Sequence, residues 1–172
     1  MIFVIGCCHF DDDSILPFRP FSSVEEMNAT IEGNWRKAVS TDDLVYVLGD
    51  FAMKRPAYWQ ERLPGRKVLV LGNHDSFMSQ DAGFLKTCES VVVRERYGRR
   101  IVTCWMSHFP YLSWPERSEG SIHLHAHCHG TVEQSLPGVP GPQRLDMSAD
   151  VWEFTPVPLE VAAALAAERI KH

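Results

Sequence analysis

The stretch Val68-Leu69-Val70-Leu71-Gly72-Asn73-His74-Asp75 is the most informative part of the sequence for the fold class. Its first four residues are apolar and two are β-branched, which is typical of a short strand buried on both faces. The strand ends at a glycine, and Asn73, His74 and Asp75 follow at once. In an α/β sheet these side chains would lie at the carboxyl end of a strand, where such proteins usually bind ligands. The same residue types also form turns, so the stretch alone leaves a binding site and a plain turn as alternatives.

The length and composition bound the class of protein. At 172 residues the chain is long enough for one domain with a substantial core, and we expect a single domain over residues 1–172. Hydrophobic content of 45% and charged content of 23% are ordinary for a soluble globular protein. The net charge of −5 gives no strong signal for nucleic acid or anionic membranes. No run approaches the ~20 apolar residues of a membrane span.

The cysteines and the N-terminus predict a location. The chain has five cysteines and no paired C-x-x-C framework. The N-terminal residues lack the basic region and the length of a signal peptide. We therefore expect a cytoplasmic protein with reduced thiols. The oligomeric state cannot be read from these features.

Other predicted strands end in the same way as residues 67–71. Residues 2–5 precede Cys7 and His9, and residues 44–48 precede Gly49 and Asp50. Asp50 alone could be a turn former or a helix cap. The repetition of ligand-type side chains after three apolar strands is what indicates a functional site.

The remaining elements follow from local patterns. Ser23 and Glu26 have the spacing of a capping box, and an apolar stripe follows as far as residue 38. We predict a short helix over 57–63, a hairpin of strands at 91–93 and 101–105, a last strand at 151–154 and a helix from 158 to about 169. Residues 77–88 are helical or irregular, and the Pro- and Gly-rich residues 131–143 form a loop. The elements together predict an α/β fold with a partly antiparallel sheet.

Five of the eight histidines lie within residues 108–129. Strict alternation over 122–130 would place His123, His125, His127 and His129 on one side of an extended segment. The alternative is a solvated edge strand. Four imidazoles on one face are unusual without a metal, and we favour metal binding.

The residues at the strand ends offer enough nitrogen, oxygen and sulfur donors for two metal ions. They are Cys7, His9, Asp50, Asn73, His74, His108, His127 and His129. Asp50 is the natural bridge between two cations. Two ions about 3.5–4 Å apart lower the pKa of a bridging water and neutralise phosphoryl oxygens during in-line attack. A protonated imidazole nearby could then give its proton to the leaving alkoxide, which is worth roughly 10²–10⁴-fold.

At this point the sequence resembles the calcineurin-like metallophosphoesterases, in particular their small single-domain bacterial and phage members. The family motifs are D-x-H, G-D, G-N-H-[DE], a lone His and G-H-x-H. Their counterparts occur here in the same order, as Cys7-Cys8-His9, Gly49-Asp50, Gly72-Asn73-His74-Asp75, Ser107-His108 and Ala126-His127-Cys128-His129. The resemblance implies a two-sheet β-sandwich flanked by helices (four layers, α/β/β/α) with the metals at the strand carboxyl ends. Residues 19–21, 44–51 and 151–152 also look like those small members.

The resemblance also implies a role for each motif residue. The residues at the first metal would be His9, Asp50 and His129. Those at the second would be Asp50, Asn73, His108 and His127. His74, supported by Asp75, would be the general acid. His125 would orient its neighbours, and we expect His123 to be structural.

Two departures from the family pattern lie in the first motif and directly after it. Cys7 replaces an aspartate; its thiolate would favour zinc or iron over manganese or magnesium at the first site. Alternatively Cys7 does not bind and the first site is weak or empty, although we favour ligation. Asp11 and Asp12 replace the usual Gly and His, and Asp12 would repel an anionic substrate unless it is neutralised. Ala126 in place of Gly is a small change.

The sequence therefore predicts a metal-dependent phosphoesterase with a bridging hydroxide between two divalent ions (zinc, iron or manganese). Its substrate would be a small phosphomonoester or phosphodiester, with a nucleotide or cyclic nucleotide among the candidates. The alternative is a catalytically impaired single-metal scaffold or interaction protein of the same fold. The reason for considering it is Cys7, which replaces the aspartate of the family motif. The sequence does not distinguish a monoesterase from a diesterase.

Overall fold

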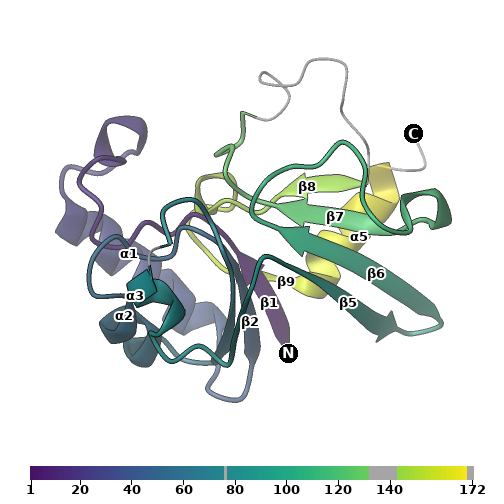
Figure 1. Cartoon of the computed structure of the whole chain (residues 1–172), viewed down its shortest axis with the longest axis horizontal. Coiled ribbons are helices and arrows are strands. Elements are labelled where there is room, and N and C mark those ends of the chain that lie inside the picture. The colour runs from purple at the N-terminus through teal and green to yellow at the C-terminus, as the bar shows by residue number, and fades with distance from the viewer. Residues whose placement is uncertain (76, 132–142, 170–172) are drawn as a thin grey trace.

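The computed structural model describes residues 1–75, 77–131 and 143–169, and within them it shows an α/β protein with two mixed β-sheets (Figure 1). The first sheet has the order β4-β3-β2-β1-β9. Its parallel strands are β1 (Ile2–Ile5), β2 (Leu44–Leu48), β3 (Arg66–Val70) and β4 (Lys86–Cys88), and β9 (Val157–Pro158) pairs antiparallel with β1. The second sheet has the order β5-β6-β7-β8. Its strands are β5 (Ser90–Tyr97), β6 (Arg100–Ser107), β7 (Ile122–His125) and β8 (Arg144–Asp146).

The second sheet mixes two kinds of pairing. Strands β5 and β6 form an antiparallel hairpin, whereas β6, β7 and β8 run parallel to one another. The predicted hairpin is therefore confirmed, and it continues into parallel strands. Because β6 and β7 are parallel neighbours, the residues that follow them meet at one edge of the sheet.

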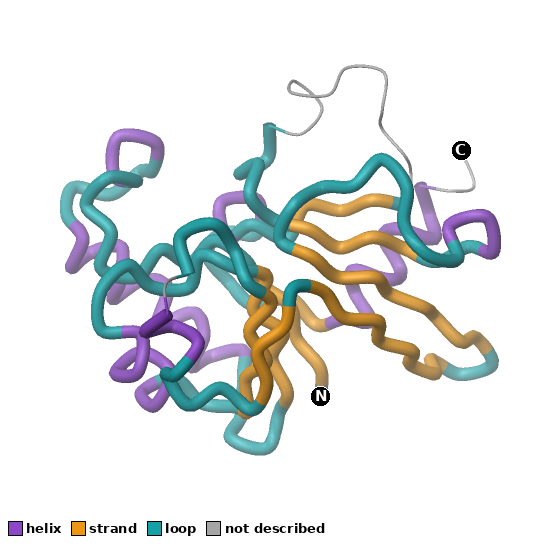
Figure 2. Tube along the Cα trace, in the orientation of Figure 1, coloured by secondary structure: helices purple, strands orange, loops and turns teal. Residues whose placement is uncertain are grey.

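Helices and one-turn 3₁₀ segments connect the strands (Figure 2). The helices are α1 (Val24–Ala38), α2 (Pro56–Arg62), α3 (Phe77–Gln80) and α5 (Leu159–Arg169), and the 3₁₀ turns are Leu16–Phe18, Arg117–Glu119 and Ala149–Val151. Helix α1 begins as its sequence predicts, since the Ser23 side chain accepts a hydrogen bond from the Glu26 N–H at 3.1 Å. Among the described residues, no helix combines the length and hydrophobicity that crossing a membrane would require.

The first sheet is buried on both faces. On one face α1 contributes Met27, Ile31 and Trp35 to a core with strand residues such as Phe3 and Val47. The other face packs into a second core, which is made of three groups of residues. They are Val4, Leu48 and Val70 of the first sheet, Cys104, Met106 and Leu124 of the second, and Leu159, Ala162, Ala163 and Ala166 of α5. Burial on both faces explains why β1, β2 and β3 are nearly continuous apolar runs.

The last third of the chain contains the main errors in the predicted elements. Residues 151–154 do not form the predicted strand. Val151 ends a 3₁₀ turn, and Glu153 and Phe154 have φ of 50° and 57°, in the left-handed region that a strand cannot contain. Three short strands, β4, β8 and β9, were not predicted because two or three residues carry no readable periodicity. The predicted loop 131–143 lies almost entirely outside the described residues.

Candidate metal centre

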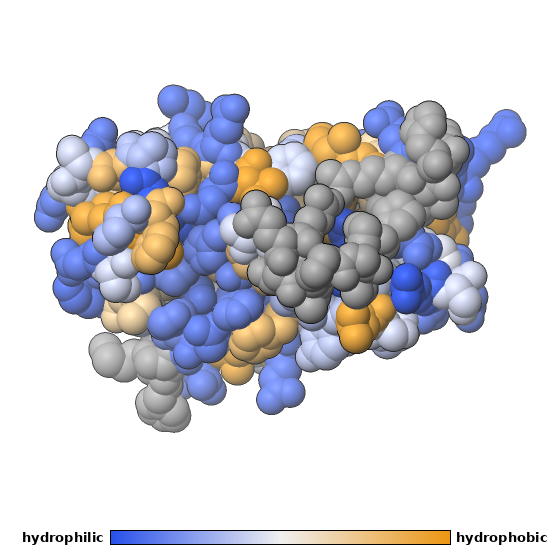
Figure 3. Space-filling view, turned by 90° about the horizontal axis from the view of Figure 1, so that it is seen from above, coloured by the Kyte–Doolittle hydropathy of each residue, from blue (hydrophilic) through white to orange (hydrophobic). Residues whose placement is uncertain are grey.

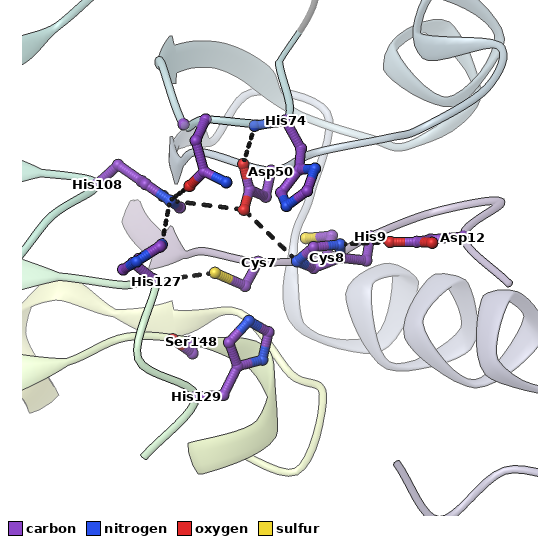
Figure 4. Close-up of polar contacts among 12 residues, drawn as sticks. Cys7, Cys8, His9, Asp12, Asp50, His74, His108, His127, His129 and Ser148 are labelled. Carbon is purple, nitrogen blue, oxygen red and sulfur yellow. Dashed lines mark hydrogen bonds and ion pairs between the residues drawn. The ribbon is translucent and has the colours of Figure 1, made fainter. Parts of the chain in front are cut away.

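Side chains from both sheets converge beyond the carboxyl ends of β1, β2, β3, β6 and β7 (Figure 4). The rings of His108 and His127 lie 5.0 Å apart between centroids, and those of His9 and His129 lie 5.3 Å apart. Asp50 lies between the two pairs, with one carboxylate oxygen 3.6 Å from His9 Nε2 and 3.5 Å from His108 Nε2. Residues that are far apart in the sequence thus meet at one place, as the predicted site requires.

One group of donors surrounds His108 Nε2. Asn73 Oδ1 lies 2.9 Å from this atom, His127 Nδ1 3.2 Å and Asp50 Oδ2 3.5 Å. Atoms that bind one cation at about 2.1 Å are separated from each other by about 3.0–3.5 Å. The spacing of this group therefore fits ligands of a common ion, and its members are those predicted for the second metal.

The hydrogen bond on the other side of the His108 ring supports the interpretation that His108 Nε2 is a metal ligand. Its Nδ1 lies 2.9 Å from the Leu48 carbonyl oxygen, which can only accept, so Nδ1 carries the proton. In the neutral ring, Nε2 then presents a lone pair to the oxygens of Asn73 and Asp50. Lone pairs facing each other repel, and a cation among them removes the repulsion. Metal-binding histidines commonly have their second nitrogen fixed in this way.

A second group consists of Cys7, His9 and His129, whose ligand atoms all lie within 4.8 Å of one another. His9 is only 4% exposed, and its Nε2 is buried without a hydrogen-bond partner in the described structure. Burial lowers the pKa of His9 to about 4, so the ring is neutral at pH 7. An unpaired buried nitrogen that faces Asp50 and Cys7 suits a metal ligand, and the group matches the predicted first site.

Cys7 lies between the two groups, because its sulfur is also within 4.8 Å of ligand atoms of Asp50 and His108. The sulfur accepts a hydrogen bond from the His127 N–H at 3.2 Å. Burial raises the pKa of the Cys7 thiol well above its ordinary value, and the charge of Asp50 raises it further. Cys7 is therefore a neutral thiol unless a bound cation displaces its proton.

Backbone strain is concentrated at this site. Among the residues that the structure describes, ten non-glycine residues have positive φ, and five of them are predicted ligands: Cys7, His9, Asp50, His127 and His129. Left-handed conformations are uncommon outside glycine and cluster at functional sites. They also correct the predicted extended segment 122–130. Strand β7 ends at His125, and the left-handed turns at His127 and His129 bring these two side chains to the site.

Two glycines allow the strand ends to approach closely. A Cβ on Gly72 would lie 2.3 Å from Asp50 Oδ1, and a Cβ on Gly49 would lie 2.3 Å from His108 Nδ1. Real Cβ atoms do not come this close to other atoms, so both positions require glycine. The glycine at each strand end therefore makes room for a predicted ligand.

Asp75 has a different role from the predicted one. Its carboxylate accepts three backbone N–H hydrogen bonds, from Asp50 (2.8 Å), Phe51 (3.0 Å) and Gly72 (2.8 Å). Both oxygens are used in this way, so Asp75 joins the β2 and β3 turns and does not hold the His74 imidazole. The exposed His74 is fixed through its backbone, since its N–H donates to Asp50 Oδ1 at 2.9 Å.

The other two histidines of the run lie behind the site. His123 is buried; its Nδ1 contacts the Trp105 carbonyl at 3.1 Å, and its Nε2 accepts from the Tyr111 N–H at 3.1 Å. The predicted structural role of His123 is therefore confirmed. His125 is also buried, with Nδ1 2.9 Å from the Ala126 carbonyl.

Arg19 and Asp150 are site residues that the sequence did not predict. Asp150 Oδ2 lies 2.7 Å from His129 Nδ1, and Asp150 also accepts two hydrogen bonds from Arg19, at 2.9 Å each. The buried Arg19 guanidinium further donates to the carbonyls of Cys7 (2.6 Å) and Cys8 (3.0 Å). Arg19 and Asp150 are 131 positions apart. The only signal was the likeness of residues 19–21 and 151–152, which contain or adjoin these two residues, to the small family members.

A pocket of about 560 Å³ adjoins the site on the side of His127 and His129. Its other lining residues are Ile15, Phe18, Cys128, Thr131 and Asp150. Figure 3 shows the molecule from above; the visible part of this face is mostly hydrophilic, with separate hydrophobic patches. The fold and the site together define an α/β protein with two mixed sheets and a cluster of residues at the strand ends that could hold metal ions.

Comparison with known proteins identifies relatives of the chain. No family model matches it. The uncharacterized protein MJ1445 of Methanocaldococcus jannaschii is 31% identical over 172 residues, which cover 95% of this chain and 90% of that protein. The gene 66 proteins of Mycobacterium phages D29 and L5 are 31% and 32% identical over 69% and 63% of this chain, and 72% and 67% of their own length. The chain therefore belongs to the family of MJ1445 and these phage proteins.

One solved structure has a similar fold. It is the crystal structure of AQ665, a protein of unknown function from Aquifex aeolicus, with a TM-score of 0.71 and 21% identity. The match covers 96% of this chain and 98% of that one. At this identity the likeness concerns the fold alone.

Proposed function

We propose that the chain is a metal-dependent phosphoric ester hydrolase of the calcineurin-like metallophosphoesterase type. The observation that carries the proposal is the position of Asp50. One of its oxygens lies 3.6 Å from His9 Nε2 and 3.5 Å from His108 Nε2, and each of these nitrogens belongs to a separate group of donors. A carboxylate between two donor groups is the arrangement that a dinuclear site needs.

The donor atoms present fit two divalent ions. Cys7, His9, Asp50 and His129 would hold the first, and Asp50, Asn73, His108 and His127 would hold the second. Nitrogen, oxygen and sulfur donors suit zinc, iron or manganese, and the sulfur favours zinc or iron at the first position. When bound, such ions supply a water of lowered pKa as the nucleophile and neutralise charge on the phosphoryl oxygens.

His74 is the proposed proton donor to the leaving group. It is exposed at the same edge as the donor groups, and its ring lies 5.6 Å from the His9 ring. The hydrogen bond from its N–H to Asp50 fixes the backbone while leaving the imidazole available. The proposal thus retains His74 as the acid and gives Asp75 the separate task of holding the loop.

The proposed fold is the four-layer α/β/β/α sandwich of this family. Helix α1 covers one sheet, as the shared core with Phe3 and Val47 indicates. On the outer face of the second sheet, Trp105 and His123 pack against Tyr111 and Trp114 of the segment that precedes β7. In the described residues this segment contains one 3₁₀ turn, so a loop occupies the position of the fourth layer there.

The proposed substrate is a small phosphomonoester or phosphodiester, with nucleotides and cyclic nucleotides among the candidates. The pocket beside His127 and His129 has room for the ester group of such a molecule. None of the described lining residues is Lys or Arg, and Arg19 is already engaged by Asp150. Charge on the substrate would therefore be met at the metal positions. The five cysteines are free, in keeping with reduced thiols, and a cytoplasmic location stays a prediction.

Hydrolysis of generic aryl phosphate mono- and diesters tests the proposal. The metal-free chain would be supplied with Zn²⁺, Fe²⁺ or Mn²⁺, and bound metal would be counted by elemental analysis. We expect two metals per chain and turnover with at least one of them. Asp50→Asn should abolish both the metal binding and the turnover. Asp42→Asn, on the exposed turn before β2, should change neither the metal content nor the turnover. Absence of turnover with every metal would contradict the proposal.

The second candidate is a scaffold with one metal and no chemistry. The observation that favours it is Cys7, whose thiol must lose a proton that burial holds firmly. The scaffold predicts fewer than two metals per chain and no gain from Cys7→Asp. If Cys7→Asp instead raises turnover, or extends it to Mn²⁺, the chain is an enzyme with a retuned first site.

A further inference from the structure

Asp12 is held between two partners beside the proposed first metal. Its Oδ2 lies 2.7 Å from His9 Nδ1, and the two side chains are 5% and 4% exposed. Its Oδ1 accepts hydrogen bonds from the Ser14 N–H at 2.9 Å and the Ser14 hydroxyl at 2.6 Å. Both carboxylate oxygens are therefore occupied within the loop. The predicted repulsion of an anionic substrate by Asp12 is accordingly reduced, because its charge is directed at Ser14 and at His9, the second of which is shown in Figure 4.

The contact with Asp12 determines the state of the His9 ring. A carboxylate accepts, so Nδ1 carries the proton, and Nε2 of the neutral ring carries a lone pair. That lone pair is buried, has no hydrogen-bond partner in the described structure and lies 3.6 Å from Asp50 Oδ2. Without Asp12 the imidazole ring could flip, or its proton could move between the two nitrogens. With Asp12, Nε2 is directed at the first metal position in the form that a metal requires.

His129 shows the same arrangement with one difference. Its Nδ1 lies 2.7 Å from Asp150, but Asp150 also binds the guanidinium of Arg19 through two hydrogen bonds of 2.9 Å. The charge of Asp150 is thus shared with a cation. The partners of Asp12 are His9 and the uncharged Ser14, so more of its charge acts on the histidine. A carboxylate in this position makes a ligating imidazole a stronger donor.

We infer that Asp12 is a positioning residue that fixes the tautomer of His9 and raises the affinity of the first metal site. The inference rests on the proposed function, since it assigns a role toward the metal. It also bears on Cys7. Cys7 and Asp12 both depart from the family pattern, and both lie next to His9. The carboxylate of Asp12 adds attraction for a cation at the position where the thiol of Cys7 must give up its proton.

Titration of the metal-free full-length chain with Co²⁺ alone tests this role. Thiolate ligation of Co²⁺ gives a near-ultraviolet charge-transfer band, which Cys7→Ser should abolish, so the band reports on the first site. We expect Asp12→Ala to weaken the binding step that produces the band by about 10–100-fold. Asp12→Asn keeps an oxygen that can accept from Nδ1–H, and we expect a smaller loss. Binding at the other site, followed by calorimetry, should not change.

Asp13 provides the matched control. It is adjacent in the chain and carries the same charge, but its side chain is 73% exposed and pairs with Lys54 at the surface. Asp13→Ala should leave both binding steps unchanged. Urea unfolding of the metal-free variants checks that each is folded. If Asp12→Ala is unfolded, the comparison of Asp12→Asn with the native chain serves as the test.

The outcomes separate this inference from the proposed function. If the native chain binds two Co²⁺ ions and both Asp12 variants bind them equally well, the role of Asp12 is wrong and the function stands. Equal losses in the Asp12 and Asp13 variants would also overturn it, because they would reflect overall charge. If the native chain binds no Co²⁺, the proposed function fails together with the inference.

Discussion

The replacement Asp150→Asn tests how the buried ion pair behind the candidate site stabilises the fold. Asp150 accepts two hydrogen bonds from Arg19 and one from His129, and the Arg19 side chain is fully buried. Burial alone would raise the pKa of Asp150, but the hydrogen bonds from His129 and Arg19 lower it from 3.8 to about 2. A difference of almost two pKa units corresponds to about 2 kcal/mol of stabilisation by the ionised form.

The sign of the pH dependence follows from the direction of this shift. The folded-state pKa is lowered, so the contribution is complete above about pH 4 and is lost as the pH falls through about 2. At pH 7 the asparagine variant loses this contribution and also leaves the Arg19 charge without its partner. Removing one member of a buried pair costs about 3–5 kcal/mol. Near pH 2 the two proteins should differ much less.

Urea unfolding of the metal-free chain, followed by circular dichroism at pH 7 and near pH 2.5, measures both effects. The matched control is Asp13→Asn, which disrupts the exposed pair with Lys54 and should change stability little. A cost below about 1 kcal/mol at pH 7 would refute the reasoning, since buried pairs are expected to cost several times more. An equal cost at both pH values would show that the ionised form of Asp150 is not what stabilises the fold.

Three other replacements test separate parts of the site. Gly72→Ala would bring a Cβ to 2.3 Å from Asp50 Oδ1 and should release bound metal, as measured by elemental analysis. The control is Gly33→Ala in α1, where the added Cβ meets no atom within 4 Å; it should instead stabilise the fold by about 0.5–1 kcal/mol. Asp75→Ala leaves three backbone N–H groups without their acceptor and should cost at least about 2 kcal/mol in urea unfolding. His74→Ala should leave stability unchanged but lower kcat about 10²–10⁴-fold, and least for aryl esters with the most acidic leaving group. If Asp75→Ala lowers kcat without lowering stability, the predicted support of His74 by Asp75 is restored.

The sequence predicts the first sheet well for a physical reason. Its strands are buried on both faces, so each appears as an apolar run, and the runs of β2 and β3 end near glycines that the site itself requires. The order β3-β2-β1 makes these strands neighbours, and their carboxyl ends therefore meet. The meeting of Asp50, His74 and His9 could thus be expected from local patterns alone. Local patterns also indicated His108, His127 and His129 as donors, and only their assignment to particular metals depended on the family resemblance.

What the sequence could not supply is the backbone conformation at the ligands and the long-range polar contacts. Alternation through residue 129 is a local pattern, and it is wrong because His127 and His129 have φ of 67° and 47°. These conformations are imposed by surrounding structure and have no signature in side-chain periodicity. The contact of Arg19 with Asp150 is equally invisible, since nothing local to either residue specifies a partner 131 positions away.

The two hypotheses for Cys7 are that it binds the first metal, or that it does not bind and the first site is empty. They differ in which polar atoms stay buried without a partner. If the first metal position were abandoned, His9 Nε2 would remain buried without a partner, which costs about 1–3 kcal/mol. Asp12 would then hold the ring in the orientation that creates this cost. A bound cation gives the His9 nitrogen a partner and relieves its approach to Asp50, and it compensates the energy needed to ionise the Cys7 thiol. The arrangement around His9 therefore favours ligation by Cys7 over an empty first site.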